Sequence, residues 1–361
     1  MTSSPPPRLS MLELAPIVAG GDSAQALRNS AALARHVEQL GYTRFWVAEH
    51  HNMAGVASSA TAVLIGHIAA HTQSIRVGSG GIMLPNHAPL VVAEQFGTLA
   101  TLFPGRIDLG LGRAPGTDPL TTRALRRDRL GAGDDFPQQV AELRGYLGPE
   151  QPGQPVRAIP GTGTNVPVWL LGSSLCGAQL AAQLGLPFAF AAHFAPAQLH
   201  EALQLYRHLF QPSATLSQPY AMACIPVLAA DSDQKAQRLV TTPYQKFLNL
   251  IRGDRRPLPP PVDSMDGLWS PREEFSVRGE WLGAAVFGGP ETVKAGLQKL
   301  LDETGVNEIM LSVDCHDFAD RLRCCEIVAD ILSQLRTCSK SREQERDKAK
   351  TSEKAECTSG T

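Results

Sequence analysis

Short runs rich in β-branched and aromatic residues alternate along the chain with longer stretches in which apolar residues recur every three or four positions. This alternation is typical of parallel strands joined by crossover helices. Eight runs have the length and composition of buried strands: Arg8–Leu14, Arg44–Ala48, Ile75–Gly81, Ile107–Leu111, Val168–Leu171, Phe188–Ala192, Tyr220–Ala229 and Glu308–Val313. Eight such units in one chain predict an α/β fold, a closed (β/α)8 TIM barrel with loop insertions.

The boundaries of this domain follow from composition. Residues 9–336 hold the repeat, and the stretches 115–165 and 251–281 exceed it, so we expect both to be loop insertions. Residues 1–8 include three consecutive prolines and predict a flexible N-terminal arm. Residues 337–361 carry six Lys or Arg and five Asp or Glu but no Leu, Ile, Val or Phe, which predicts a disordered charged tail.

Composition and charge narrow the class of protein. Hydrophobic residues make up 43% of the chain, and 33 Lys and Arg stand against 35 Asp and Glu, without a basic stripe that would hold nucleic acid. The seven cysteines are odd in number and form no C-x-x-C pair, which favours a reducing compartment and argues against a zinc or disulfide framework. With no apolar leader and no long apolar run, we expect a cytoplasmic protein without a membrane span.

Polar residues gather directly after the predicted strands, where the loops of a β/α barrel build its active site. These positions are Glu49–Asn52, Gly80–His87, Gly110–Gly116, Gly172–Ser174, His193 and Asp314. A dinucleotide fingerprint is excluded at the glycine run, because Pro115 breaks G-x-G-x-x-G. His67 and His71 are spaced as a helical metal pair, but the sequence offers no third ligand, so we interpret them as helix-face residues and predict no metal site.

An anion site is one interpretation of the segment Gly172–Ser174. Ser173 and Ser174 lie between a strand and the predicted helix Gln179–Leu184, where free N–H groups favour a phosphate or carboxylate. Arg113, in the neighbouring glycine-rich turn, could supply the charge. An ordinary helix cap and a surface ion pair explain the same residues, so both interpretations stay open.

Two further positions suggest chemistry. His50 and His51 follow a buried strand, and only one of them can face the barrel mouth because neighbouring side chains alternate. An imidazole suits proton transfer near neutral pH, although two packing histidines are the alternative. Gly80 and Gly81 indicate an unusual backbone or the close approach of a flat ligand, with a simple turn as the alternative.

Together these segments resemble the bacterial luciferase-like flavin monooxygenases. Phe45–His51 resembles the strand-two E-H-H motif of that family, and Pro104–Arg113 resembles its strand-four G-R-x-x-x-G-x-x-R segment. Val77–Pro85 resembles the segment that carries a non-prolyl cis peptide beneath the flavin ring. The similarity extends from about Leu9 to Leu335 and is closest to the single-chain subgroup with N-H-x-P-L-V-V-A-E-Q-F-G after strand three.

The resemblance implies a role for particular residues. His50 takes the place of the acid/base histidine beside the flavin, and the Gly80–Gly81 bond takes the place of the cis peptide. The FMN phosphate would be held by Arg113, Ser173, Ser174 and the N–H of Gly177. Two positions depart from the family. Gly112 stands where luciferase has a reactive cysteine, so thiol sensitivity should be missing there, and Cys176 stands where the subgroup has tyrosine.

The resemblance also implies a reaction. The chain would be an FMN-dependent monooxygenase that takes reduced FMN from a separate flavin reductase and oxygenates a small organic substrate with dioxygen, through a peroxyflavin. The rival expectations are a deazaflavin-dependent oxidoreductase and a non-catalytic flavin-binding protein. Family members pair helices near Ala60–His71 and Leu90–Leu102, which implies a homodimer. Packing of the small residues in these helices against the chain's own barrel explains them equally well.

Overall fold

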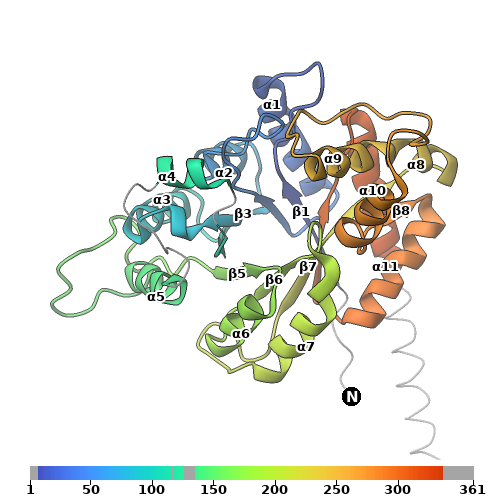
Figure 1. Ribbon diagram of the computed structural model, residues 1–361. Helices are drawn as coiled ribbons and strands as arrows, with labels where there is room; N and C mark the ends of the chain where they lie inside the picture. The colour runs from blue at the N-terminus through green and yellow to red at the C-terminus, as the bar shows by residue number, and fades with distance from the viewer. Residues whose placement is uncertain (1–6, 115–116, 126–134, 336–361) are drawn as a thin grey trace, which may run out of the picture.

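Eight parallel strands close into a barrel in the computed structural model, which describes residues 7–114, 117–125 and 135–335 (Figure 1). The barrel strands are β1 (Arg8–Glu13), β2 (Arg44–Val47), β3 (Arg76–Met83), β4 (Ile107–Gly112), β5 (Val168–Gly172), β6 (Phe188–Ala191), β7 (Ala221–Ala229) and β9 (Glu308–Ser312). Neighbours follow chain order from β1 to β6. The pairs β6–β7, β7–β9 and β9–β1 complete the ring. The predicted (β/α)8 barrel is therefore confirmed. Each of the eight expected runs overlaps one of its strands, and β3, β4 and β5 extend one or two residues beyond the expected ends.

The sequence did not reveal one strand. β8 (Val286–Gly288) pairs in parallel with Val227–Ala229, the last residues of β7, and lies outside the closed ring. Three residues are too few to show an alternating pattern, so its position could not be read from periodicity.

Helices surround the barrel on its outer side. They are α1 (Ser23–Gln39), α2 (Thr61–Ala70), η1 (Leu84–Asn86), α3 (Pro89–Leu102), α4 (Pro119–Leu125), α5 (Phe136–Leu147), α6 (Leu175–Gln183), η2 (Pro196–Gln198), α7 (Leu199–Leu209), α8 (Asp233–Leu239), α9 (Thr241–Ile251), α10 (Pro271–Phe275), η3 (Ser276–Trp281) and α11 (Pro290–Thr304), and residues 318–335 are also helical. Asp22 is the N-cap residue of α1, and its carboxylate accepts the Gln25 N–H at 2.7 Å. None of the helices in the described ranges has the length and apolar character to cross a bilayer.

Both expected insertions contain helices, whereas the expected arm and tail lie mostly outside the described residues. The stretch 115–165 contains α4 and α5, and α5 packs against α3. The stretch 251–281 contains α10 and η3. Of the expected arm, only Pro7 and Arg8 are described, and Arg8 already belongs to β1; the expected tail lies wholly outside the described residues.

Buried charges fill the barrel interior at the end where the strands begin. The Arg44 guanidinium donates to Asp108 at 2.7 Å and to Glu308 at 3.1 Å, and all three residues are buried. Above this layer, Trp46 and Trp169 pack edge to face with their ring centroids 5.1 Å apart. The two layers close this end of the barrel, so a ligand site can form only at the opposite end.

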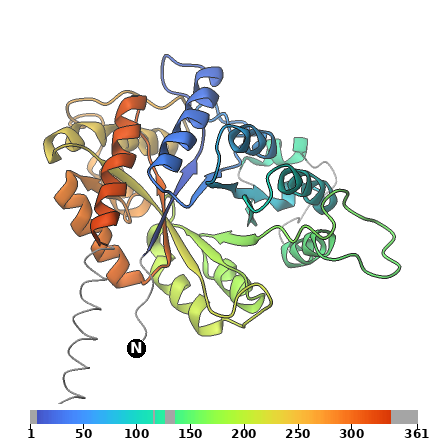
Figure 2. The ribbon, with the colours of Figure 1, turned by 180° about the vertical axis from the view of Figure 1, so that it is seen from behind.

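A second buried ion pair joins the two ends of the chain outside the barrel. The Arg321 guanidinium donates to the Glu13 carboxylate at 2.6 Å, and the Ser30 hydroxyl donates to the same carboxylate at 2.8 Å. Figure 2 shows the helix of residues 318–335, in red, beside α1, in blue. The pair fixes this last helix against the first β/α unit.

Candidate functional site

Glycines at the end of β3 have the backbone geometry that the resemblance implies. The Gly80–Gly81 peptide bond is cis, and the register with β4 shifts between Ser79 and Ile82. A Cβ on Gly80 would lie 2.7 Å from Leu12 Cδ1, and a Cβ on Gly81 would lie 2.7 Å from the carbonyl oxygen of Gly110. The cis bond is confirmed, and the alternative of a simple turn is wrong because both residues lie within β3.

The expected phosphate site is assembled from neighbouring strands. Gly112 of β4 pairs with Leu171 of β5, so Arg113 and the Gly172–Ser174 segment leave the barrel side by side. Ser174 is the N-cap residue of α6, and its hydroxyl makes no capping hydrogen bond. Ser173 and Ser174 are half-buried and Arg113 is exposed. The arrangement leaves two hydroxyls, a guanidinium and the first turn of α6 at one edge of the barrel.

The start of α6 differs from our expectation. The helix begins at Leu175, four residues before the predicted Gln179, because the small Gly177 can approach the strand end. The Cα of Gly177 lies 3.4 Å from the place of a Cβ on Gly172, so the helix and strand backbones are in close contact. Gly177 therefore lies in the first turn of α6, where backbone N–H groups have no partner within the helix.

The two histidines after β2 have different environments. His51 Nε2 lies 2.9 Å from the Glu49 carboxylate. His50 instead lies close enough to His193, which follows β6, to lower the pKa of that imidazole. Trp46 and Ala48 of the same segment pack in the apolar cluster inside the barrel, so alternation places His50 rather than His51 on the barrel side.

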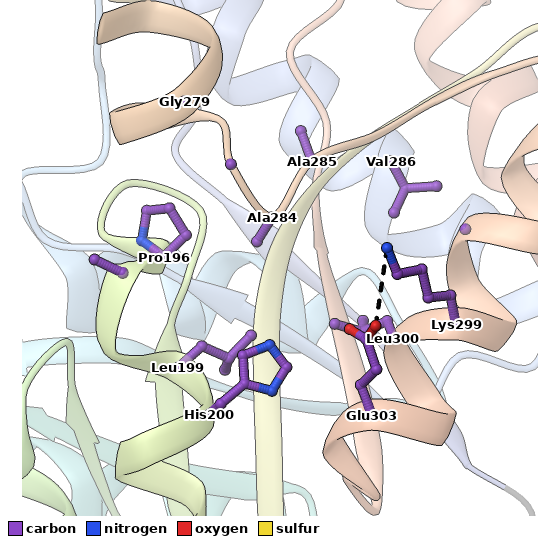
Figure 3. Close-up of a pocket in the computed structure, with 13 residues that line it drawn as sticks. Pro196, Leu199, His200, Gly279, Ala284, Ala285, Val286, Lys299, Leu300 and Glu303 are labelled. Atoms are coloured by element: carbon purple, nitrogen blue, oxygen red, sulfur yellow. Dashed lines mark ion pairs between the residues drawn. The ribbon is translucent and has the colours of Figure 1, made fainter.

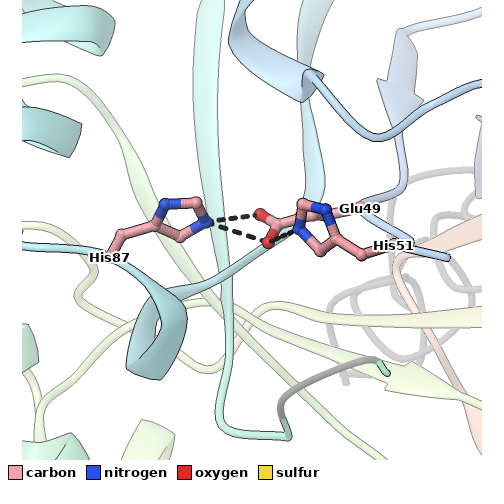
Figure 4. Close-up of side chains that lie close together, drawn as sticks. All are labelled: Glu49, His51 and His87. Carbon is pink, nitrogen blue, oxygen red and sulfur yellow. Dashed lines mark hydrogen bonds and ion pairs between the residues drawn. The ribbon is translucent and has the colours of Figure 1, made fainter. Parts of the chain in front are cut away.

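Glu49 is a residue of this site that sequence reasoning did not single out. Its buried carboxylate faces His51 and also His87, whose Nε2 lies 2.9 and 3.0 Å from the two oxygens (Figure 4). Burial raises the pKa of Glu49, but the hydrogen bonds from His87, His51 and the Met83 N–H outweigh it and hold the pKa below its usual value. Because 38 residues separate Glu49 from His87, no local spacing signal could have joined them.

Three polar side chains, those of His193, Lys246 and Asp314, lie near the ends of β6 and β9. Lys246, on α9, donates to both carboxylate oxygens of Asp314 at 2.8 Å, and Asp314 follows β9. Burial, Lys246 and His50 together lower the pKa of His193 to about 3, so its imidazole is neutral at physiological pH. His193 and Asp314 were expected at the mouth, whereas Lys246 comes from a helix with no motif around it.

Other candidates from the sequence have structural roles. The rings of His67 and His71 lie 4.3 Å apart on the exposed side of α2, and His71 Nδ1 lies 2.8 Å from the carbonyl oxygen of His67, in agreement with their interpretation as helix-face residues. Gly112 is buried, and a Cβ there would lie 2.8 Å from Met83 Sδ, so a cysteine at this position would require the Met83 side chain to move. Cys176 is exposed in the first turn of α6.

A groove of about 400 Å³ lies away from these residues, between the start of α7, α11 and the turn before β8 (Figure 3). Pro196, Leu199 and Ala284 line it, and Lys299 and Glu303 form an ion pair along one turn of α11 at 3.8 Å. None of the predicted site residues lines this groove, so it is not part of the candidate site.

Comparison with known proteins gives close relatives. The family described as luciferase-like monooxygenase matches residues 9–308. Uncharacterized protein YvbT of Bacillus subtilis is 58% identical over 324 residues, which are 90% of this chain and 96% of YvbT. A luciferase-like monooxygenase of Escherichia coli K12 is 53% identical over 326 residues, 90% of this chain and 97% of its own. The crystal structure of apo-MsnO8 is 38% identical, covers 90% of this chain and 98% of its own, and has a TM-score of 0.81.

More distant proteins share the fold or part of the sequence. The oxygenating constituent of a 3,6-diketocamphane monooxygenase from Pseudomonas putida, solved with FMN, is 18% identical with a TM-score of 0.68 over 90% of this chain and 97% of its own. An F420-dependent secondary alcohol dehydrogenase is 14% identical with a TM-score of 0.62 over 90% and 98%. The N-acetyl-S-alkylcysteine monooxygenase of B. subtilis is 42% identical over 188 residues, 51% of this chain and 56% of its own.

Proposed function

The chain belongs to the luciferase-like monooxygenase family, and from that premise we propose that it is an FMN-dependent monooxygenase. It takes reduced FMN from a separate flavin reductase and uses dioxygen to oxygenate a small organic substrate. The observation that carries the proposal is the meeting of three features at one end of the barrel: the Gly80–Gly81 segment without side chains, His50, and the edge formed by Arg113 and α6.

The residues present fit a flavin mononucleotide. Arg113 and the first turn of α6 provide positive charge and N–H donors for a phosphate, and the Ser174 hydroxyl is not used for capping. Gly80 and Gly81 have no side chains, so a planar ring can approach the β3 backbone closely. When bound in its reduced form, the flavin supplies the electrons that activate dioxygen.

The chain's own residues then control protons and water. His50 faces the mouth and is the group that can give or take a proton there. His193 is neutral, so across from His50 it offers one N–H donor and one lone pair rather than a second charge. The apolar layer beneath, with Leu12, Trp46 and Trp169, keeps water from reaching the site through the barrel.

The test is turnover with isotopically labelled oxygen. The purified chain is mixed with anaerobically reduced FMN and a substrate panel, ¹⁸O₂ is admitted, and products are analysed by mass spectrometry. The panel includes N-acetyl-S-alkylcysteines, because a relative carries that name. One ¹⁸O atom in a product supports the proposal. Reoxidation of the flavin at the rate seen without protein, with no labelled product from any panel member, argues for a non-catalytic flavin-binding protein.

A hydride-transferring enzyme is the second candidate, because an F420-dependent alcohol dehydrogenase has the same fold. The same purified chain is titrated with FMN and with the deazaflavin F420. Tighter binding of F420, and its reduction by an alcohol without dioxygen, would replace the monooxygenase proposal.

We also propose that the protein is a cytoplasmic homodimer that pairs through α2 and α3. The large side chains Val63, Val91 and Leu102 are exposed on these helices. The small residues, by contrast, serve the chain's own packing: Gly66 faces Leu99, and a Cβ on Gly97 would overlap Gly161. Light scattering of the native protein and of a Val63→Glu variant tests the dimer, which the variant should weaken.

A further inference from the structure

Glu49 connects the loop after β2 to the loop after β3. Its Oε2 accepts the N–H of Met83, the last residue of β3, at 3.1 Å, and both of its oxygens lie within 3.0 Å of His87 Nε2. The carboxylate is buried, so water does not compete for these contacts. The loop that carries His50 is thereby held to the end of β3, the strand that contains Gly80 and Gly81, and to the loop that follows it.

The residues on both sides of His50 are held together by one hydrogen-bonded cluster. Glu49 faces β3, and His51 Nε2 bonds to the same carboxylate at 2.9 Å (Figure 4). The main chain is fixed as well, because the Thr117 hydroxyl donates to the His51 carbonyl at 3.1 Å. Since side chains alternate along an extended segment, anchoring residues 49 and 51 on one side directs residue 50 to the other.

We propose that Glu49 and His87 are positioning residues for His50, which they direct toward the barrel mouth through the hydrogen bonds of the carboxylate. The inference rests on the proposed function only for its effect on turnover. The hydrogen bonds and the direction of His50 are properties of the chain without flavin.

The positions of the ring protons determine what this cluster can do. Glu49 accepts from two imidazoles only if His51 and His87 are both protonated at Nε2. If instead both Nε2 atoms carried lone pairs, the same three side chains would hold a divalent cation, since two histidines and a carboxylate are a common metal-binding set. The protonation of Nε2 therefore separates a positioning cluster from a metal site.

The first experiment records long-range ¹H–¹⁵N NMR spectra of the imidazoles in the full chain without flavin. In the native protein, His51 and His87 should show protonated Nε2 atoms. The ring signals of His50 should move or broaden in Glu49→Gln and His87→Leu. They should return toward native positions in His87→Gln, because the glutamine amide can still donate to Glu49. The exposed His71→Gln is the matched control and should leave His50 unchanged.

The second experiment compares FMN affinity with turnover in the same variants. His87→Leu should lower turnover by about 10- to 100-fold, the scale of a misplaced catalytic group, with FMN affinity within about twofold of native. His87→Gln should recover most of it. A purely structural cluster would lower the melting temperature of His87→Leu without moving the His50 signals.

Unmoved His50 signals in folded Glu49→Gln and His87→Leu would overturn the inference. A stoichiometric divalent metal in the purified protein, with unprotonated Nε2 atoms, would also overturn it. Failure of the proposed function looks different, because the native chain would then show no turnover while the His50 signals still responded to these substitutions.

Discussion

Gly112 of β4 and Leu171 of β5 are partners in the parallel register of the barrel, which places Arg113 beside the Gly172–Ser174 segment. The guanidinium and the first turn of α6 thus face the same edge from two separate β/α units. Arg113 is exposed there, so its guanidinium is accessible to an anionic ligand.

Removal of Arg113 should weaken the binding of flavin phosphate specifically. A charge-assisted hydrogen bond contributes about 1.5–3 kcal/mol, so Arg113→Ala should raise the Kd for FMN by about 10- to 100-fold. Riboflavin lacks the phosphate and serves as the control ligand, with a Kd that stays nearly unchanged. Fluorescence titration of both flavins measures this, and equal losses for the two would remove Arg113 from the phosphate site.

His50→Ala should separate binding from reaction. The residue is expected to move a proton and not to hold the flavin, so FMN affinity should stay near native while turnover falls by about 100-fold or more. His71→Ala, which changes an exposed histidine outside the site, should behave as native in both assays. Native turnover in His50→Ala would exclude His50 from the mechanism.

Gly81 should tolerate no side chain. A Cβ there would lie 2.7 Å from the Gly110 carbonyl oxygen, which belongs to the backbone of β4 and cannot move aside, so Gly81→Ala should cost about 1–3 kcal/mol of unfolding free energy. Gly145, in α5, has no atom within 4 Å of the corresponding position. Gly145→Ala should therefore be neutral or stabilise by up to about 1 kcal/mol, and urea unfolding of the pair would show the contrast.

His193 should make stability depend on pH in the acidic range. The pKa of His193 in the folded chain, about 3, lies below the usual value of 6.5. Between these two pH values the imidazole is protonated in the unfolded chain and neutral in the folded chain. Its contribution is fully present above pH 6.5 and is lost as pH falls toward 3, with a slope of up to about 1.4 kcal/mol per pH unit. In His193→Gln this slope should vanish. Urea unfolding of both proteins at pH 7 and pH 5 measures the difference, and parallel losses would contradict it.

The ion pair between Glu13 and Arg321 should be costly to break from one side. Arg321→Met leaves a buried carboxylate without its counter-charge and should destabilise the protein by about 3–5 kcal/mol. The double variant Glu13→Gln, Arg321→Met should recover part of that loss, since no unpaired charge remains. Thermal unfolding of the three proteins would decide, and a double variant less stable than Arg321→Met would contradict the argument.

The barrel could be predicted from sequence because its signals are local. The eight strands are short apolar runs bounded by turn residues. The cap of α1 is local as well, because Asp22 and Gln25 are only three positions apart. β8 escaped because three residues hold no pattern, and its place depends on β7. The start of α6 was misplaced because the close contact of Gly172 with Gly177 leaves no local trace in the sequence.

Part of the site could also be predicted from local signals in the sequence. Residues directly after strands, such as His50 and Arg113, follow from the general rule that strand ends build the site. Lys246 and the contact between Glu49 and His87 do not follow from it. They depend on where a helix and two loops meet in space, which sequence distance does not reveal.

The buried side chains of Arg44, Asp108 and Glu308 fill the barrel interior at the end opposite the site. In the described part of the chain, a ligand inside the barrel can therefore enter and leave only at the end where the strands finish. If two ligands occupy the barrel together, the one nearer this opening restricts the exit of the other.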